Sequence, residues 1–299
     1  MKVTILMSAF NGEQFIAEQL ESLFNQKDVE VAVVVRDDGS TDSTSAILGE
    51  YQAQGKLTYY SGQNKGWAMS FLDLLLNAPA SDYYAFCDHD DIWMPEKLSE
   101  ALKCLETLPV GPRLYASNLY YFRDGKNEGL HRLTDYRLHP GFGLVRCIAY
   151  GCTCVFNSKL ANIIRNNPPR HIYAHDYWLF QTALLLGHVY YDERSFILYR
   201  QHQSQQIGAK RTPLEIFKRR VNHLKTLSTD ARIHEDYAKE ILYCYSSHLS
   251  PENKELVECM AYYRSNLSYR LRLMFSSTYS MGRLSNNIMK AIRVLISKY

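Results

Sequence analysis

The sequence contains no hydrophobic run long enough to cross a membrane as a helix. Such a helix needs about 20 consecutive apolar residues, and no stretch of the 299 residues approaches that length. The apolar run near the start, Val3–Met7, turns polar by Asn11 and is short for a secretion signal. We therefore expect a cytoplasmic chain whose only membrane contact is peripheral, on the inner face of the cell membrane.

Cysteine is present, but not in the spacing of a metal or redox site. The seven cysteines are scattered, and the sequence has no Cys-x-x-Cys pair and no Cys/His cluster with zinc spacing. Cys152 and Cys154 are separated by one residue, which is too tight for the usual zinc site. Reduced, buried thiols are the expectation for this chain.

Two glycine-rich phosphate loops are also missing from the sequence. No Gly-x-Gly-x-x-Gly follows the first apolar run, and no Gly-x-x-x-x-Gly-Lys occurs, which argues against the two common nucleotide loops. Repeats and low-complexity tracts are absent as well. With 46% hydrophobic and 22% charged residues, the chain can bury a large core, as one sizeable domain with an appendage.

The formal net charge of +3 hides an uneven distribution. From Gln203 onward there are 16 Lys and Arg against 8 Asp and Glu, and the rest of the chain is net acidic. Residues 209–299 are expected to form a helical, basic region. Two apolar stripes lie beside basic residues there, namely Leu214, Phe217, Val221 and Leu224, then Leu284, Ile288, Ile292 and Leu295.

These two stripes leave three interpretations open. Basic amphipathic helices can lie on an anionic lipid surface. They can equally pack onto the core or each other, or form the contact of a homodimer. We expect no nucleic-acid partner.

The first 208 residues alternate apolar runs with helical patterns. Strands are predicted at 3–9, 30–35, 57–60 and 83–87, each followed by helical spacing. Short alternation of this kind predicts an α/β fold, with a mostly parallel sheet and helices on both faces. The polar loops that follow the strands then gather at one edge, where such sheets bind nucleotides.

Three carboxylates crowd the turn after the fourth apolar run. Asp88, Asp90 and Asp91 directly follow Tyr83–Cys87. Their mutual repulsion is tolerated when a cation or hydrogen-bond donors compensate it, which predicts a ligand site. The alternative is a solvated acidic turn that caps the helix starting at Glu96.

Six motifs occur in the first 208 residues, in the order Met7–Gly12, Arg36–Asp42, Asn64–Gly66, Cys87–Trp93, His175–Trp178 and Tyr199–His202. Together they resemble the motifs of the family 2 glycosyltransferases over most of residues 1–208. The resemblance implies the glycosyltransferase-A fold, a Rossmann-like sheet, with 1–208 as the catalytic domain and 209–299 as a helical extension. The residues in these motifs are most similar to those of bacterial rhamnosyltransferases that build cell-wall or O-antigen polysaccharide.

The resemblance also implies the residues that bind a nucleotide-sugar donor. They are Ser8, Ala9, Phe10, Asn11, Glu13, Asp37, Asp38, Asn64, Lys65, Asp88 and Asp91. Phe10 offers a ring to the base, and Asp37 corresponds to the carboxylate that hydrogen-bonds a pyrimidine. Turn chemistry alone is the alternative for Asp37 and Asp38, and capping of the next helix is the alternative for Asp91.

In the same way the resemblance assigns a metal and a base. Asp90 is the expected ligand of Mg²⁺ or Mn²⁺, with Asp88 second and His202 as an additional ligand or as plain polar surface. Asp176 corresponds to the catalytic base, with simple helix capping as its alternative. Trp93, His175 and Trp178 are candidate acceptor contacts, although core packing is the ordinary role of such tryptophans.

The function so implied is an inverting, metal-dependent glycosyltransferase. The expected donor is dTDP-β-L-rhamnose, and the expected acceptor is a saccharide linked to polyprenyl diphosphate. Transfer of glucose, galactose or GlcNAc from a UDP donor is one alternative, and a non-catalytic saccharide- or nucleotide-binding module is another. A sugar-1-phosphate nucleotidylyltransferase would need a glycine-rich basic loop after the first strand, which Asn11-Gly12-Glu13 does not supply.

Overall fold

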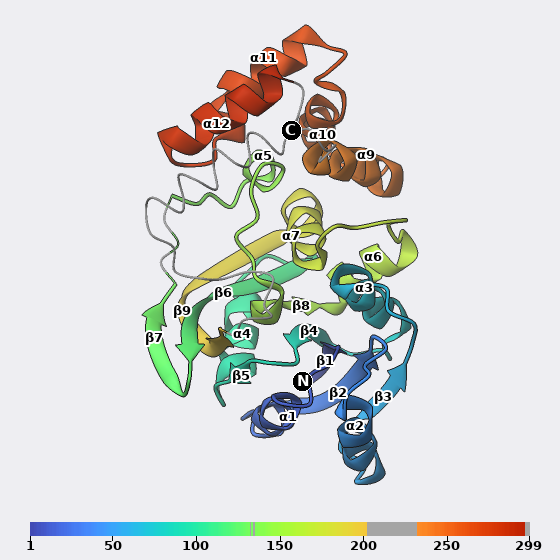
Figure 1. Cartoon of the computed structure of the whole chain (residues 1–299). Helices are drawn as coiled ribbons and strands as arrows, with labels where there is room; N and C mark the ends of the chain where they lie inside the picture. The colour runs from blue at the N-terminus through green and yellow to red at the C-terminus, as the bar shows by residue number, and fades with distance from the viewer. Residues whose placement is uncertain (132, 134, 202–231, 297–299) are drawn as a thin grey trace. The chain divides into compact units, whose positions relative to one another are not determined.

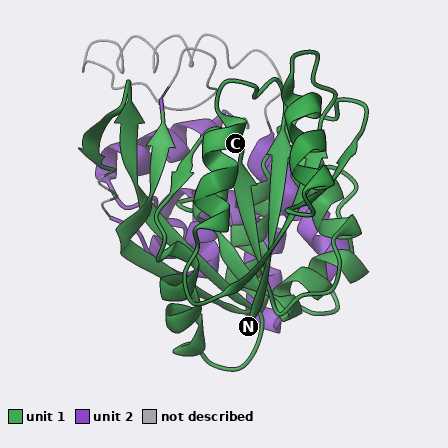
Figure 2. Cartoon of the chain, turned by 90° about the horizontal axis from the view of Figure 1, so that it is seen from below, with its two compact units in different colours: residues 1–133, 147–200, 247–249 green, residues 134–146, 201–246, 250–299 purple. Residues whose placement is uncertain are grey.

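The structure is a computed structural model that describes residues 1–131, 133, 135–201 and 232–296. The chain divides into two compact units (Figure 2). Unit 1 comprises residues 1–133, 147–200 and 247–249, and unit 2 comprises 134–146, 201–246 and 250–299. The expected boundary at 208/209 lies outside the described residues. The two units change at Arg200/Gln201, and segment 134–146 also belongs to unit 2.

The first half of unit 1 follows the predicted alternation (Figure 1). Its strands are β1 (Lys2–Ala9), β2 (Glu30–Asp37), β3 (Thr58–Ser61) and β4 (Tyr83–Asp88). Its helices are α1 (Ile16–Phe24), α2 (Thr44–Ala53) and α3 (Trp67–Asn77). The four strands pair in parallel in the order β3-β2-β1-β4. Strand β1 is buried from Val3 to Ala9, as expected for a central parallel strand covered on both faces.

The second half of unit 1 extends this sheet with mixed pairing. Its elements are β5 (Ile92–Trp93), α4 (Lys97–Glu106), β6 (Arg113–Arg123), β7 (Lys126–Leu130), η1 (Gly151–Thr153), β8 (Val155–Asn157), α6 (Ser158–Asn166), α7 (His175–Leu186) and β9 (His188–Arg200). Strand β8 is antiparallel to β4 and β6, whereas β6 and β9 are parallel. The α/β fold class is thus confirmed, with its parallel strands concentrated in the first half.

Two short segments of this half depend on tertiary pairing. Gly151–Thr153 forms the 3-10 turn η1, and strand β8 begins only at Val155, where it pairs with β4 and β6. The exposed segment Lys126–Leu130 becomes a strand by pairing with β6. Hydrogen bonds to neighbouring strands select the backbone conformation of such short segments.

The carboxyl ends of the parallel strands meet at one edge of the sheet, as predicted. In the register of the sheet, Ser8 lies opposite Arg36 of β2 on one side and opposite Asp88 of β4 on the other. Ala9 is likewise paired with Asp37. The loops that follow β1, β2 and β4 therefore start side by side, which is the arrangement that places ligands in such sheets.

Unit 2 is helical in its described residues. It contains α5 (Pro140–Gly143), α9 (Ile233–Tyr245), α10 (Pro251–Tyr262), α11 (Leu267–Phe275), the 3-10 turn η3 (Ser277–Tyr279) and α12 (Leu284–Leu295). Helices α9 and α10 pack together, as do α11 and α12. The predicted stripe that begins at Leu214 lies outside the described residues. None of the helices described is long and apolar enough to cross a membrane.

Candidate active site

The loop after β1 is fastened to the loop after β2. Asn11 has a φ of 49°, in the left-handed region that Asn tolerates, and its Oδ1 accepts a hydrogen bond from the Thr41 amide at 2.8 Å. Glu13 Oε2 accepts from the Ser43 amide at 2.9 Å. Asn11 and Glu13 thus use their side chains within the fold, whereas Phe10 is 44% exposed and presents its ring to solvent.

Asp37 is buried and surrounded by hydroxyl groups. Its Oδ1 accepts from the amide and the hydroxyl of Ser40 at 3.0 and 2.5 Å, and its Oδ2 accepts from the hydroxyls of Ser45 and Ser61. Burial raises the pKa of Asp37, but these hydrogen bonds outweigh burial and hold the pKa below its ordinary value. The contacts of Asp37 in this structure are therefore those of turn chemistry, and its contact with a base stays a prediction.

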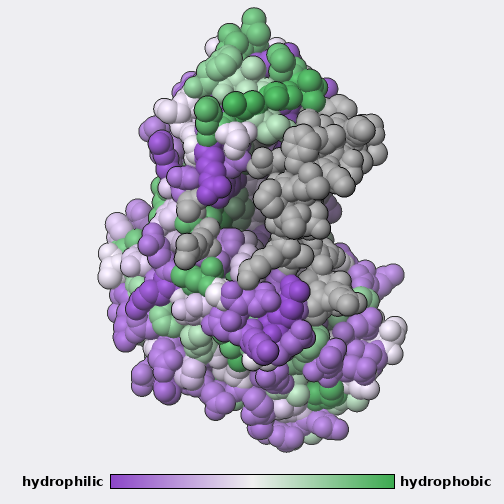
Figure 3. All heavy atoms as spheres, turned by 60° about the vertical axis from the view of Figure 1, so that its left-hand side comes forward, coloured by the Kyte–Doolittle hydropathy of each residue, from purple (hydrophilic) through white to green (hydrophobic). Residues whose placement is uncertain are grey.

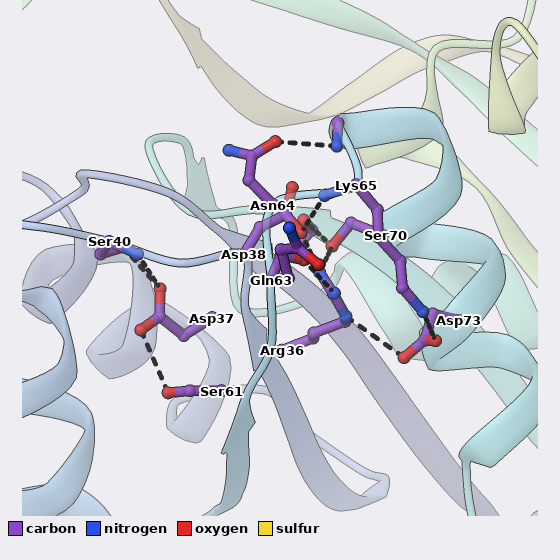
Figure 4. Close-up of polar contacts among 12 residues, drawn as sticks. Arg36, Asp37, Asp38, Ser40, Ser61, Gln63, Asn64, Lys65, Ser70 and Asp73 are labelled. Atoms are coloured by element: carbon purple, nitrogen blue, oxygen red, sulfur yellow. Dashed lines mark hydrogen bonds and ion pairs between the residues drawn. The ribbon is translucent and has the colours of Figure 1, made fainter.

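A buried arginine organises the loops after β2 and β3 (Figure 4). Arg36 is 1% exposed, pairs with Asp38, and places its Nε 3.2 Å from Asp73 Oδ2. Its Nη1 donates to Ser70 Oγ at 3.1 Å and its Nη2 to the Gln63 carbonyl at 2.9 Å. Two carboxylates and two further acceptors thus satisfy a charge that would otherwise be costly to bury.

The same network holds the predicted donor residues of the next loop. The Lys65 amide donates to Asp38 Oδ1 at 2.9 Å, and the Lys65 ammonium lies 2.6 Å from Asp73 Oδ1. Asn64 Oδ1 accepts from the amide two residues later at 3.0 Å. The Ala9 carbonyl accepts from the Asp38 amide at 2.8 Å. These contacts connect the carboxyl ends of β1, β2 and β3 through one residue, Asp38, which uses its backbone amide toward β1 and its carboxylate toward Arg36 and Lys65.

Arg36 and Asp73 belong to this site, although the sequence motifs predicted no role for either of them. Ser8, which they did predict, joins the network through a 2.6 Å hydrogen bond between its Oγ and Ser70 Oγ. A signal for the missed pair does exist in the sequence: a cation ends the apolar run of β2, and a lone carboxylate interrupts the apolar pattern of α3. A charge at such a position has to find a partner.

The acidic turn after β4 forms a group with a cysteine from η1. Ligand atoms of Asp88, Asp91 and Cys152 all lie within 4.8 Å of one another. Asp91 is fully buried, its Oδ1 accepts from the Arg200 amide at 3.0 Å, and its Oδ2 is a buried oxygen without a hydrogen-bond partner. The helix-capping alternative for this turn is wrong, because the cap residue of α4 is Glu96 and no side chain caps that helix.

Asp90 is buried next to this group without being one of its three members. It is 8% exposed, its charge adds to burial in raising the pKa of both Asp88 and Asp91, and its backbone carbonyl accepts from Arg200 Nε at 2.7 Å. Its role as the metal ligand stays a prediction. His202 lies outside the described residues.

The electrostatics of the acidic turn suit a hard cation. Burial, with the charges of Asp90 and Asp176, raises the pKa of Asp88 to about 8, and burial with neighbouring charges raises that of Asp91 well above its ordinary value. Burial also raises the pKa of Cys152, so its thiol is protonated and is a poor ligand. The carboxylates, with the unpaired Oδ2 of Asp91, are the oxygen donors that Mg²⁺ and Mn²⁺ prefer, so the site fits such an ion.

Asp176 lies in the first turn of α7. Its Oδ1 accepts from the Tyr177 amide at 2.7 Å, and the Gly151 amide also donates to its carboxylate. Burial outweighs these hydrogen bonds and raises the pKa of Asp176 to about 6. Because the charge of Asp176 contributes to the raised pKa of Asp88, the two carboxylates are close enough to interact.

The predicted acceptor residues are buried. His175 stacks on Phe71 with ring centroids 3.9 Å apart, and burial lowers its pKa to about 3, so its imidazole is neutral. Trp178 is 1% exposed and Trp93 is 2% exposed, with Lys97 Nζ 3.2 Å from the Trp93 ring centroid. Neither tryptophan is exposed enough to contact a sugar in this structure. Both pack in the core, which was the alternative to an acceptor contact.

Gly151 is expected to be intolerant of a side chain. A Cβ at this position would lie 2.1 Å from His175 Nε2, next to the amide that contacts Asp176. We expect Gly151→Ala to lower the free energy of unfolding by about 1–3 kcal/mol, because the imidazole has to move. Urea unfolding measures this. Gly49→Ala in α2 is the matched control, with only ordinary contact at 3.8 Å and an expected gain of about 0.5–1 kcal/mol. Equal stabilities of the two variants would contradict the packing argument.

Comparisons with known proteins agree with this architecture. A solved structure of S. aureus TarS, residues 1–349, aligns with a TM-score of 0.59 at 17% identity, covering 100% of this chain and 81% of that one. A second structure of the same protein, in complex with UDP-GlcNAc, gives a TM-score of 0.58 at 16% identity and covers 93% of that chain. At this identity the likeness concerns the fold.

Sequence relatives identify the family. Residues 4–163 match the sequence model of the family Glycosyl transferase family 2. A protein of Shigella flexneri named dTDP-rhamnosyl transferase RfbG is 31% identical over 217 residues, covering 68% of this chain and 74% of the relative. An uncharacterized glycosyltransferase of Rickettsia typhi is 26% identical over 226 residues, covering 72% and 69%. The chain therefore belongs to glycosyltransferase family 2 and has the glycosyltransferase-A fold.

Proposed function

We propose that this glycosyltransferase transfers L-rhamnose, with inversion, from dTDP-β-L-rhamnose to a saccharide carried on polyprenyl diphosphate. The observation that carries the proposal is the position of Asp176 beside the acidic turn. The short element η1 contacts both, since Gly151 donates to Asp176 and Cys152 lies against Asp88 and Asp91. The choice of rhamnose rests on the 31% identity to the Shigella flexneri dTDP-rhamnosyl transferase.

The chemistry of an inverting transfer needs one carboxylate on the acceptor side. In the proposed step, Asp176 takes the proton of the acceptor hydroxyl while that oxygen bonds to the anomeric carbon and the bond from that carbon to the diphosphate breaks. The pKa of about 6 suits this task, because the carboxylate is charged at neutral pH yet basic enough to accept a proton. Asp88, with Asp91 or Asp90, would hold Mg²⁺ or Mn²⁺. Such an ion, when bound, neutralises charge on the departing diphosphate.

The donor is proposed to lie over the carboxyl ends of β1 and β2. Phe10 is the exposed ring there and is available to stack on the base. Lys65 and Asn64 lie in a loop held in place by Asp38 and Asp73, so they form a pre-positioned rim for the ribose or the diphosphate. Trp67, at the start of α3, is 39% exposed and is the tryptophan that retains a surface for a sugar.

A second donor class is supported by a specific observation. The structurally similar S. aureus TarS has been solved with UDP-GlcNAc, and thymine and uracil present the same hydrogen-bonding edge to a protein. Transfer of GlcNAc, glucose or galactose from UDP is therefore the alternative. Calorimetric titration of dTDP-rhamnose and UDP-sugars in the presence of Mn²⁺ decides between them, since tighter binding of a UDP-sugar would replace the rhamnose assignment.

Replacing the base is expected to abolish transfer and to spare the fold. We expect Asp176→Asn to lower kcat by about 100-fold or more, because the amide cannot accept the proton, with the affinity for donor unchanged. Product formation and donor calorimetry measure the two effects. Asp124→Asn, in an exposed turn of unit 1, is the matched control. An Asp176→Asn enzyme with near-normal kcat would remove Asp176 from this role.

The pH profile of wild-type kcat/KM should report the same carboxylate. Burial raises the pKa of Asp176 in the free protein, so the fraction of active base falls as the pH drops through about 6. We expect a loss of about tenfold per pH unit below that point. A divalent cation near Asp88 would favour the charged form and move the inflection to lower pH. A profile that stays flat down to pH 4.5 would contradict the assignment.

Metal-dependent donor binding should depend on the acidic turn. We expect Asp88→Ala and Asp90→Ala each to weaken donor binding in Mn²⁺ by about tenfold or more, while binding without metal changes little. Titrations with and without Mn²⁺ measure the difference, and Asp82→Ala, exposed and outside the turn, is the control. If Asp90→Ala keeps the full effect of Mn²⁺, the ligand is Asp91, as the grouping in the structure favours; if the wild type shows no effect of Mn²⁺, metal dependence is refuted.

A further inference from the structure

The outer face of helices α11 and α12 in unit 2 is apolar and exposed. On α11 the exposed apolar residues recur every four positions, and on α12 they recur every three or four positions along the whole helix. They are Leu267 (69% exposed), Leu271 (48%), Phe275 (72%), Leu284 (76%), Ile288 (51%), Ile292 (38%) and Leu295 (61%). Figure 3 shows hydrophobic residues gathered over this pair of helices, at the top of the view. We call this surface the α11–α12 face.

Helix α12 packs with its polar side inward. Lys290 is 2% exposed and its Nζ donates to the Tyr279 carbonyl at 2.6 Å, while Val294 is the buried apolar neighbour on that side. The Leu284–Leu295 stripe points the other way. A helix that only completed a core would bury its apolar stripe and expose its lysine. This orientation therefore indicates that the stripe has a partner outside unit 2.

The charge of the surrounding segment defines that partner. Residues 259–299 contain seven Lys and Arg and no Asp or Glu, and unit 2 as a whole has 18 basic against 9 acidic residues. Arg283 and Arg264 pair with Asp135 and Glu235, yet their side chains remain 62% and 36% exposed next to the two helices. Tyr262, at the end of α10, is 47% exposed. Such a face matches an anionic lipid surface. Its apolar residues would contact the acyl chains, its cations the anionic headgroups, and its tyrosine the interface between them.

Geometry and charge argue against two other occupants. Helices of nine and twelve residues rise only about 14 and 18 Å, so they cannot cross a hydrocarbon core about 30 Å thick. A two-fold dimer through the α11–α12 face would place the cations of one copy against the same cations of the other. Residues 259–299 contain no acidic side chain. The nearby carboxylates of Asp135, Glu235 and Glu255 already pair with Arg283, Arg264 and Arg272 of the same copy.

We propose that the α11–α12 face docks this protein on an anionic membrane surface, with both helices lying in the plane of the interface. The apolar stripes enter the region between headgroups and acyl chains, and the neighbouring arginines contact the lipid phosphates. The proposal does not depend on which sugar the catalytic site transfers, and it accounts for the net-acidic unit 1 and the net-basic unit 2 in one chain.

Vesicle flotation of the full chain tests the proposal. Wild-type protein should float with phosphatidylcholine vesicles that contain about 30% phosphatidylglycerol, and at least tenfold less should float with phosphatidylcholine alone or in high salt. The triple variant Phe275→Ser, Leu284→Ser, Ile288→Ser should lose at least tenfold of its binding. The matched control is Leu76→Ser, Val110→Ser, Leu130→Ser, which removes three exposed apolar side chains from unit 1 and should float like wild type.

Each outcome decides the question. The proposal would be overturned if the fraction of protein that floats did not depend on phosphatidylglycerol. It would also be overturned if the triple variant floated as well as wild type. Sedimentation velocity without lipid gives a separate result: a wild-type dimer that the triple variant converts to a monomer would assign the face to a second copy instead. The wild-type lipid and salt series stands without any variant, and circular dichroism of both triple variants verifies that they fold. Transfer to a soluble acceptor should be the same in wild type and both variants, so a failure of docking is distinguishable from a failure of the catalytic assignment.

Discussion

The burial of three carboxylates is the constraint on which the catalytic unit depends. Asp88 ends β4, Asp91 lies in the turn that follows, and Asp176 comes from α7, more than eighty residues later in the sequence. Burial raises the pKa of all three, and neighbouring carboxylates raise those of Asp88 and Asp91 further, so the fold keeps these groups out of water at an electrostatic cost. The turn η1 contacts both parts of this group, because the Gly151 amide donates to Asp176 and Cys152 lies near Asp88 and Asp91. A site so strained without a cation is prepared to receive one.

A complementary solution is found on the donor side of the sheet. There the buried charge is a cation, Arg36, and the fold compensates it with Asp38 and Asp73 rather than leaving it for a ligand. The loops that would surround a base and ribose are therefore fixed by internal ion pairs, while the acidic turn retains an unpaired oxygen on Asp91. The two ends of the site differ in this respect. The charge of Arg36 is neutralised within the protein, whereas the charge of the acidic turn is neutralised only when a cation binds.

The sequence was informative wherever the signal is local. The four parallel strands, the convergence of their loops and the placement of Asp88 beside Ser8 follow from apolar runs and from the rules of parallel pairing. The burial of Trp93 and Trp178, the partner of Asp91 at Arg200, and the role of Cys152 depend on segments far apart in the chain. No local pattern encodes those contacts. Segment 134–146 shows the same limit, since its membership of unit 2 is a tertiary fact.

Helix α12 shows why a correct pattern can still leave an interpretation open. Its spacing predicted an apolar stripe beside basic residues, and periodicity alone is compatible with the stripe facing either a core or a foreign surface. The burial of Lys290 resolves the direction, because a helix has one inward side and here a lysine occupies it. An ammonium group tolerates that position only with a partner, which the Tyr279 carbonyl supplies. The exposed stripe is thus a consequence of how the helix is anchored, and the absence of acidic residues beyond Glu258 then selects an anionic surface as what it meets.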